Sequence, residues 1–272
     1  MILLIVVILT VLLFAGLYAY YYRRWKHLWA MDVRIPSYEL KSRVDDTLNI
    51  VMIGDSWAGL HHENGMDAYL CSKLQEKVIC PVTIISNGKG GERTRGIYKL
   101  MFSADCYGTK KLLVSKPDYC IISAGINDAA ANLGIQQFCY YYRQILDFLL
   151  TNQIRPVVLE IPNVNIWNIY EGKPLKDLVA DYAKSIMTSC KMYHFQEYRE
   201  ALYQMLVEEQ LMEKVLYIPM NDWNDQSPDI DNFLFMTDQI HLNRQGYERL
   251  DSCIALAIAK DLENTGNSSL VN

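Results

Sequence analysis

The sequence lacks the patterns that mark several common classes of protein. It has no CxxC pair, and its seven cysteines are odd in number and scattered, which argues against a disulfide framework. No basic run continues past residue 26 and the net charge is -5, so a nucleic-acid surface is not expected. The glycine-rich segment 86–92 matches neither GxGxxG nor GxxxxGK[ST], so the fingerprint of a nucleotide site is missing.

What remains is the composition of a globular protein with a hydrophobic core. Hydrophobic residues make up 51% of the chain and charged residues 21%, which is not typical of a disordered protein. A length of 272 residues fits one domain of moderate size with an appendage.

The appendage is a hydrophobic segment at the start of the chain. Residues 2–22 contain no charged side chain and are rich in Ile, Leu and Val. A helix of this length spans ~30 Å, the thickness of a bilayer core, because each residue adds ~1.5 Å. Tyrosines, tryptophans and the basic residues Arg23, Arg24 and Lys26 gather at its end, as they do at a membrane interface. Since a small-x-small cleavage site is missing, the sequence predicts a single-pass anchor in a lipid bilayer.

Two observations favour the cytoplasmic face for the rest of the chain, with the extracytoplasmic face as the alternative. Positive charges flank only the C-terminal end of the span, and the scattered cysteines are typical of reduced thiols. The predicted organisation is an anchor with its interfacial flank at 1–29, a connector at 30–46, a main domain at 47–263 and a tail at 264–272.

Short β-like runs alternate with helical patterns along the main domain. Strands are predicted at 48–53, 82–85, 118–123 and 156–161, with a weaker fifth strand at 191–195. Helices are predicted at 57–77, 94–101, 134–151, 173–190, 198–210 and 243–262. Strands joined by helical crossovers form a parallel sheet, so the predicted fold is a three-layer α/β/α sandwich of the flavodoxin-like type. Ligands of such folds bind beyond the carboxyl ends of the strands.

Candidate site residues follow the first two predicted strands. Gly54-Asp55-Ser56 comes after the first strand, where the glycine permits a tight turn and the serine opens a helix whose N–H groups favour negative charge. An ordinary helix cap is the alternative. The glycine-rich segment 86–92 follows the second strand, and it indicates either backbone that approaches a ligand or a plain flexible turn.

Polar residues at two further positions belong to the same predicted edge. Asn127 follows the third strand and offers an N–H donor for an oxyanion, with a turn role as the alternative. Asp238 precedes His241 by three residues, so its carboxylate can accept from Nδ1–H and leave Nε2 free as a base. Together the segments offer a nucleophile, oxyanion donors, a base and an acid that orients the base.

This combination, in this order, resembles the SGNH (GDSL-like) hydrolase family over most of residues 48–260. The resemblance implies a catalytic triad of Ser56, His241 and Asp238. It implies an oxyanion hole formed by Ser56, Gly91 and Asn127, with Gly88 and Gly90 as rivals of Gly91. It also implies supporting roles for Gly54, Asp55, Gly125 and Asp128.

The activity implied by the resemblance is cleavage of an ester through an acyl-enzyme, with no cofactor. Trp57-Ala58-Gly59 replaces the longer apolar continuation of the lipase branch, which argues against a lipid ester. We therefore expect a small acyl group, acetyl by preference, on a carbohydrate or cell-envelope molecule. The alternatives are an O-acyltransferase with the same triad, a lysophospholipase or thioesterase, and an inactive binding protein on the same fold.

Other histidines and acidic residues do not form a metal-site pattern. His61 and His62 are adjacent, so on a helix they point about 100° apart and do not share a face as HExxH ligands do. We expect them to be solvated or to line a pocket rim, with contact to the substrate as the alternative because they lie one or two turns after Ser56. The acidic residues Asp222, Asp225, Asp229 and Asp231 lack the spacing of a calcium loop and predict a solvated loop or a lid. Three loop aromatics either stack on sugar rings or cap the core: Trp167, Tyr170 and Trp223.

Overall fold

A computed structural model describes residues 1–26, 38–41, 46–104, 107–164, 173–190, 194–224 and 233–265. Several predicted features lie outside the described residues: most of the connector, Trp167, Tyr170, the acidic residues 225–231, and residues 266–272 of the tail.

Five parallel strands form one sheet in the order β2-β1-β3-β4-β5. The strands are β1 (Leu48–Gly54), β2 (Val82–Gly88), β3 (Tyr119–Ser123), β4 (Arg155–Leu159) and β5 (Leu216–Ile218). Every residue of β3 is buried and so are all but one of β1, as expected for strands covered on both faces. The winding direction reverses between β1 and β3, so their carboxyl ends form the topological switch point at which ligands bind in such sheets.

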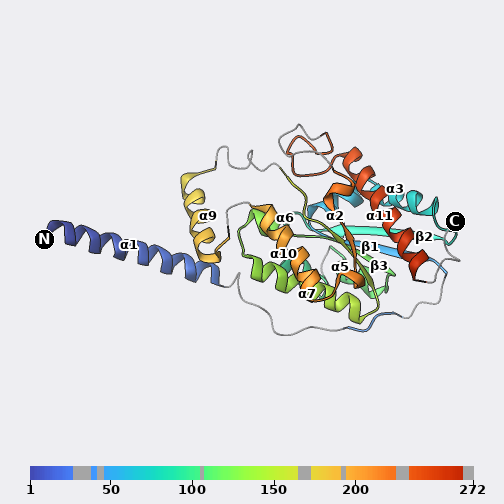
Figure 1. Cartoon of the computed structure of the whole chain (residues 1–272), viewed down its shortest axis with the longest axis horizontal. Coiled ribbons are helices and arrows are strands. Elements are labelled where there is room, and N and C mark those ends of the chain that lie inside the picture. The colour runs from blue at the N-terminus through green and yellow to red at the C-terminus, as the bar shows by residue number, and fades with distance from the viewer. Residues whose placement is uncertain are drawn as a thin grey trace.

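Helices cover both faces of this sheet (Figure 1). In chain order they are α2 (Ser56–Glu63), α3 (Met66–Gln75), α4 (Thr94–Leu100), α5 (Thr109–Val114), α6 (Ile126–Ala130), α7 (Ile135–Thr151), α9 (Leu175–Thr188), α10 (Phe195–Glu208) and α11 (Arg244–Asn264). Helices α3 and α11 pack together on one side, while α4 and α10 pack against α7 on the other. The predicted three-layer α/β/α fold is therefore confirmed.

Two predicted elements differ from the structure. Residues 191–193 of the predicted fifth strand lie outside the described residues, but its end is wrong because Phe195 begins α10, and the fifth strand of the sheet lies at Leu216–Ile218. Apolar residues recur at helical spacing from Phe195 onward, and this period favours a helix. The single helix predicted at 57–77 is two helices, because Gly65 adopts a left-handed conformation between α2 and α3.

Helix α1 (Ile2–Trp25) projects from the domain and is long and apolar enough to cross a membrane. Its only buried residue is Trp25, at the end next to the domain, where α1 contacts α9. The six cysteines among the described residues are all free thiols.

Candidate active site

Ser56 begins α2 directly beyond the carboxyl end of strand β1. The turn before it requires glycine, because a Cβ on Gly54 would lie 2.1 Å from the carbonyl oxygen of Ser123. Asp55 caps the helix, since its Oδ1 accepts from the backbone N–H of Trp57 at 3.0 Å. The tight turn thus presents the half-buried serine side chain at the edge of the sheet.

His241 and Asp238 form a hydrogen-bonded chain with Ser56. The Ser56 Oγ lies 2.8 Å from His241 Nε2, and His241 Nδ1 lies 2.6 Å from Asp238 Oδ2. When Nδ1 donates its proton to Asp238, Nε2 is the acceptor for the serine hydroxyl. Burial alone would raise the pKa of Asp238, but hydrogen bonds from the backbone and ring of His241 and from the Ile240 N–H lower it. The carboxylate therefore stays ionised beside the imidazole.

The loop that carries His241 is closed by its own hydrogen bonds. The Met236 N–H donates to the His241 carbonyl at 2.7 Å, and Phe235 forms an antiparallel bridge with Leu242. Asn243 then caps α11 through its side chain. The loop thus has a defined shape before it meets the nucleophile.

Trp57 connects this loop to the nucleophile helix. Its Nε1–H donates to the Ile240 carbonyl at 3.1 Å, while its own carbonyl accepts from the Tyr247 hydroxyl at 2.9 Å. The buried indole also packs edge-on against the rings of Trp223 and Phe235. The sequence marked Trp57 only as a departure from the lipase branch, because the contact joins residues far apart in the chain. In the structure its hydrogen bond joins the helix that begins with Ser56 to the loop that carries His241.

Asn127 and Asp128 join the loop after β2 to the end of β3. Asp128 Oδ2 accepts from the backbone N–H of Thr94 at 2.9 Å and from its hydroxyl at 2.7 Å. The Asn127 amide donates to the Glu92 carbonyl at 2.9 Å and more weakly to Asp55 at 3.4 Å. The structure therefore brings together Ser56 and Asn127, which follow neighbouring strands.

The glycines at this edge have different roles. A Cβ on Gly88 would lie 2.1 Å from the Asp55 carbonyl oxygen, so Gly88 permits close packing of β2 against the start of α2. Gly125 adopts a φ of +118°, and a Cβ there would lie 2.5 Å from a side-chain carbon of Ile161. Gly91 is exposed at a φ of +71° with open space around it. Of the three rival glycines, Gly88 is confined by packing, whereas Gly90 and Gly91 are not.

Two carboxyl groups are fully buried beneath the site. Burial raises the pKa of both Asp55 and Asp128 to about 6, although their hydrogen bonds favour the ionised form. For Asp55 these bonds come from the Trp57 N–H and the Ser123 hydroxyl, and for Asp128 from Thr94. Both groups connect segments of the site and neither touches His241 through a hydrogen bond among the described contacts.

Comparison with protein families agrees with this geometry. Residues 52–249 match the model of the GDSL-like lipase/acylhydrolase family, which is well over half of the chain. The chain belongs to this family. It is thus a serine hydrolase that acts on ester bonds. No curated protein matches the sequence.

Solved structures share the family fold at low sequence identity. A GDSL-like lipase from Bacteroides thetaiotaomicron is 16% identical with a TM-score of 0.55, over 90% of this chain and 100% of the other. A lipase/acylhydrolase from Enterococcus faecalis is 16% identical with a TM-score of 0.54, over 78% of this chain and 96% of the other. The acetylxylan esterase Axe2 from Geobacillus stearothermophilus is 15% identical with a TM-score of 0.53, over 77% of this chain and 93% of the other.

His61, within this GDSL-like domain, is fully buried, so its predicted solvated or pocket-rim position is wrong. Its Nδ1 lies 3.0 Å from Asp67 and 2.9 Å from the Ser86 hydroxyl, and its Nε2 lies 3.0 Å from Asp251. Burial alone would lower the pKa of His61, but hydrogen bonds to Asp251 and Asp67 raise it to about 9. At neutral pH a charged imidazolium therefore links α2, α3, β2 and α11. His62 is 58% exposed, as expected.

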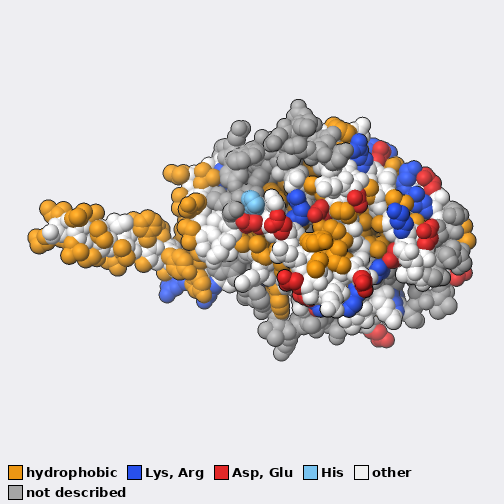
Figure 2. All heavy atoms as spheres, in the orientation of Figure 1, with side chains coloured by type: hydrophobic (Ala, Val, Ile, Leu, Met, Phe, Trp, Pro, Cys, Tyr) orange, Lys and Arg blue, Asp and Glu red, His pale blue; other side chains and the backbone are white. Residues whose placement is uncertain are grey.

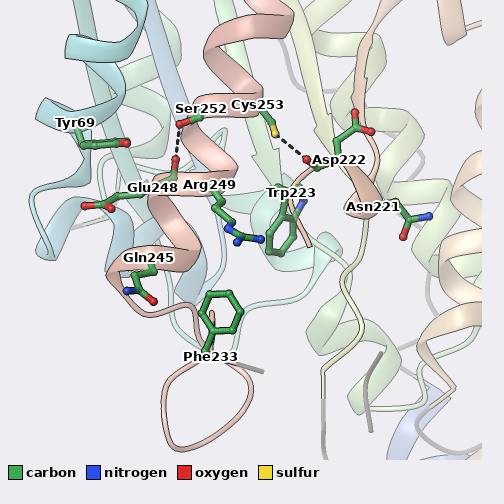
Figure 3. A pocket seen from close by; sticks show the side chains of 10 residues that line it. All are labelled: Tyr69, Asn221, Asp222, Trp223, Phe233, Gln245, Glu248, Arg249, Ser252 and Cys253. Atoms are coloured by element: carbon green, nitrogen blue, oxygen red, sulfur yellow. Dashed lines mark hydrogen bonds between the residues drawn. The ribbon is translucent and has the colours of Figure 1, made fainter. Parts of the chain in front are cut away.

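A cavity of about 660 Å³ lies beside α11, and none of the triad residues lines it. Figure 3 shows Arg249 reaching between Trp223 and Phe233, and its guanidinium carbon lies 5.2 Å from the centre of the Phe233 ring. Trp223 itself is buried against Trp57, so it caps the core, which was the alternative to sugar stacking. Trp223 therefore lines this cavity and also packs against Trp57 of α2.

We predict that Trp57→Phe slows catalysis without unfolding the protein. Phenylalanine preserves much of the ring packing but removes the N–H that bonds to Ile240. Loss of this hydrogen bond should raise the activation free energy by ~1 kcal/mol. The kcat for p-nitrophenyl acetate should then fall about fivefold, while KM stays within about twofold. Steady-state kinetics and the melting temperature check this together. An unchanged kcat would mean that the His241 loop holds its position without Trp57.

We predict that the buried His61 makes stability depend on pH. The pKa of His61 is about 9 in the folded protein and about 6.5 in the unfolded chain. Its contribution to the free energy of unfolding is therefore fully present below pH 6.5 and is lost as the pH rises through 9. The loss should be on the order of 3 kcal/mol between pH 6.5 and 9.5. The measurement is denaturant unfolding of the wild type, of His61→Asn and of Ser72→Ala, a control at an exposed position. Parallel pH profiles for the wild type and His61→Asn would contradict the assignment.

Proposed function

We propose that this protein is a membrane-anchored serine esterase that releases a small acyl group, acetyl by preference, from a carbohydrate or cell-envelope molecule. The observation that carries the proposal is the chain of hydrogen bonds from Ser56 through His241 to Asp238 at the carboxyl edge of the sheet. The preference for acetyl is supported by Trp57-Ala58-Gly59, which replaces the longer apolar continuation of the lipase branch, and by the acetyl xylan esterases among the proteins with the same fold.

Catalysis by this chain proceeds in two acyl-transfer steps. Ser56 Oγ attacks the ester carbonyl carbon while His241 Nε2 takes the hydroxyl proton, and Asp238 stabilises the imidazolium that forms. The tetrahedral intermediate collapses as His241 returns the proton to the leaving alcohol oxygen. Water, activated by the same Nε2, then attacks the acyl-serine and releases the acid.

The oxyanion is held by the backbone N–H groups of Ser56 and Gly91 and by the Asn127 amide. Gly91 is preferred over Gly88 because it lies in an open loop, whereas Gly88 is packed against α2. Asn127 already donates to the Glu92 carbonyl, and its weaker 3.4 Å bond to Asp55 is the one that an oxyanion would share. The bond of Asp128 to Thr94 holds the two loops at this spacing.

Replacement of the nucleophile should abolish acid release while the fold persists. We expect Ser56→Ala and His241→Asn each to lower kcat on p-nitrophenyl acetate by at least ~10³-fold, since each removes a reacting group. Ser72→Ala and His62→Asn, at exposed positions, are matched controls with near-normal rates. Wild-type turnover in the Ser56→Ala variant would refute the assignment.

The same assay identifies the acyl group and its acceptor. A series of esters from acetyl to dodecanoyl should show the highest kcat/KM for acetyl, and a maximum at a long chain would favour a lysophospholipase or thioesterase. Products are measured with and without an added sugar acceptor. Acetylated sugar formed in preference to free acetate would identify an O-acyltransferase.

We also propose that α1 anchors the chain and that the domain lies on the cytoplasmic face. The apolar helix is followed at its C-terminal end by Arg23 and Arg24, whose charges favour that side. Protease treatment of inverted and right-side-out vesicles tests the orientation. The protease should cut the domain only in inverted vesicles, which expose the cytoplasmic face. Cleavage only in right-side-out vesicles would instead place the domain and its substrates outside the cytoplasm.

A further inference from the structure

Helix α9 presents its apolar residues to the outside of the molecule. Leu175, Val179, Tyr182 and Ile186 are spaced by four, three and four residues, so they form one stripe along the helix, and they are 46–76% exposed. We call these four residues the α9 stripe. A surface helix of a globular protein normally turns such a stripe toward the core, so α9 is inverted.

Two polar residues of α9 face the protein instead. Asp181 is only 6% exposed and forms ion pairs with Lys173 and with Lys184 of the same helix. The Ser185 hydroxyl accepts a hydrogen bond from the Asn132 side chain at 3.2 Å. The contact between Ser185 and the buried Asn132 ties this side of α9 to the domain, and the apolar stripe lies on the exposed side.

The inverted helix lies at the base of α1. Trp25, the last residue of α1, is buried, and the Lys184 ammonium lies 5.1 Å from the centre of its ring. Figure 1 shows α9 running across the axis of α1, at the end of the domain from which α1 projects. Figure 2 shows hydrophobic side chains along α1 and again at the neighbouring end of the domain.

We propose that α9 is an interfacial helix that inserts its apolar stripe into the surface of the bilayer that α1 crosses. If residues 2–22 span the hydrocarbon core, Arg23 and Arg24 lie among the lipid headgroups, and so does the helix that packs on Trp25. A helix lying there buries its apolar face ~5–10 Å deep. The exposed Lys176 beside the stripe, with Arg23 and Arg24, complements anionic headgroups.

Insertion of α9 would also orient the active site. Asn132, which bonds to α9, follows α6 at the carboxyl edge of the sheet, the edge that holds Ser56 and Asn127. With α9 in the membrane surface, this edge faces the bilayer, so an ester carried on a membrane-attached molecule would reach Ser56 more readily than a soluble one. The proposal rests on the proposed anchoring by α1.

The test uses the full chain in vesicles of phosphatidylcholine and phosphatidylglycerol. The indole introduced by Tyr182→Trp should lose roughly half or more of its added fluorescence when the lipids carry doxyl groups on their acyl chains. Leu256→Trp, a half-exposed position on α11, is the control and should show no such loss. Combining Tyr182→Trp with Ile186→Glu should reduce the quenching at least about twofold while the protein still floats with the vesicles.

The outcomes separate the two proposals. Flotation without quenching at position 182 would overturn the interfacial helix and leave the anchor intact. Loss of flotation in the wild type would overturn the anchor and with it the role of α9. Disulfide cross-linking of two chains through Ile186→Cys, with no lipid quenching, would show that a second copy covers the α9 stripe and would overturn the proposal.

Discussion

One buried carboxylate connects the parts of the site. Asp55 accepts hydrogen bonds from the first turn of α2, from Ser123 at the end of β3 and from Asn127 beyond it. Its position between the two central strands is possible only because Gly54 leaves no side chain in the gap. The full burial that makes this carboxylate an effective connector also disfavours its ionised form, so its hydrogen bonds have to offset a desolvation cost.

The nucleophile helix is held at its other end by a second buried charge. His61 joins α2 to α3 and α11 through two carboxylates, and Trp57 joins the same helix to the histidine loop. Short polar contacts at both ends of an eight-residue helix leave it little freedom to rotate. Contacts made outside the candidate triad thus support the geometry between Ser56 and His241.

The sheet and the candidate triad could be predicted from the sequence because both follow from local patterns and a topological rule. Apolar runs identify β1 and β3, and parallel strands bring their carboxyl ends together, so Ser56 and Asn127 meet without knowledge of any tertiary contact. Asp238 and His241 are close in the chain and bond locally. His61 could not be predicted in this way, because Asp251 comes to it from a distant helix. The orientation of α9 could not be predicted either, because helical periodicity reveals an apolar stripe but not whether it faces the core or the outside.

The outward stripe of α9 has a consequence for handling the protein in water. Removing α1 would leave Leu175, Val179, Tyr182 and Ile186 exposed and would also take away Trp25, against which Lys184 rests. Contiguous apolar surface of this kind promotes self-association. Without the anchor, the α9 stripe would face water and promote self-association. A soluble form of the domain therefore requires polar substitutions along α9 as well as removal of α1.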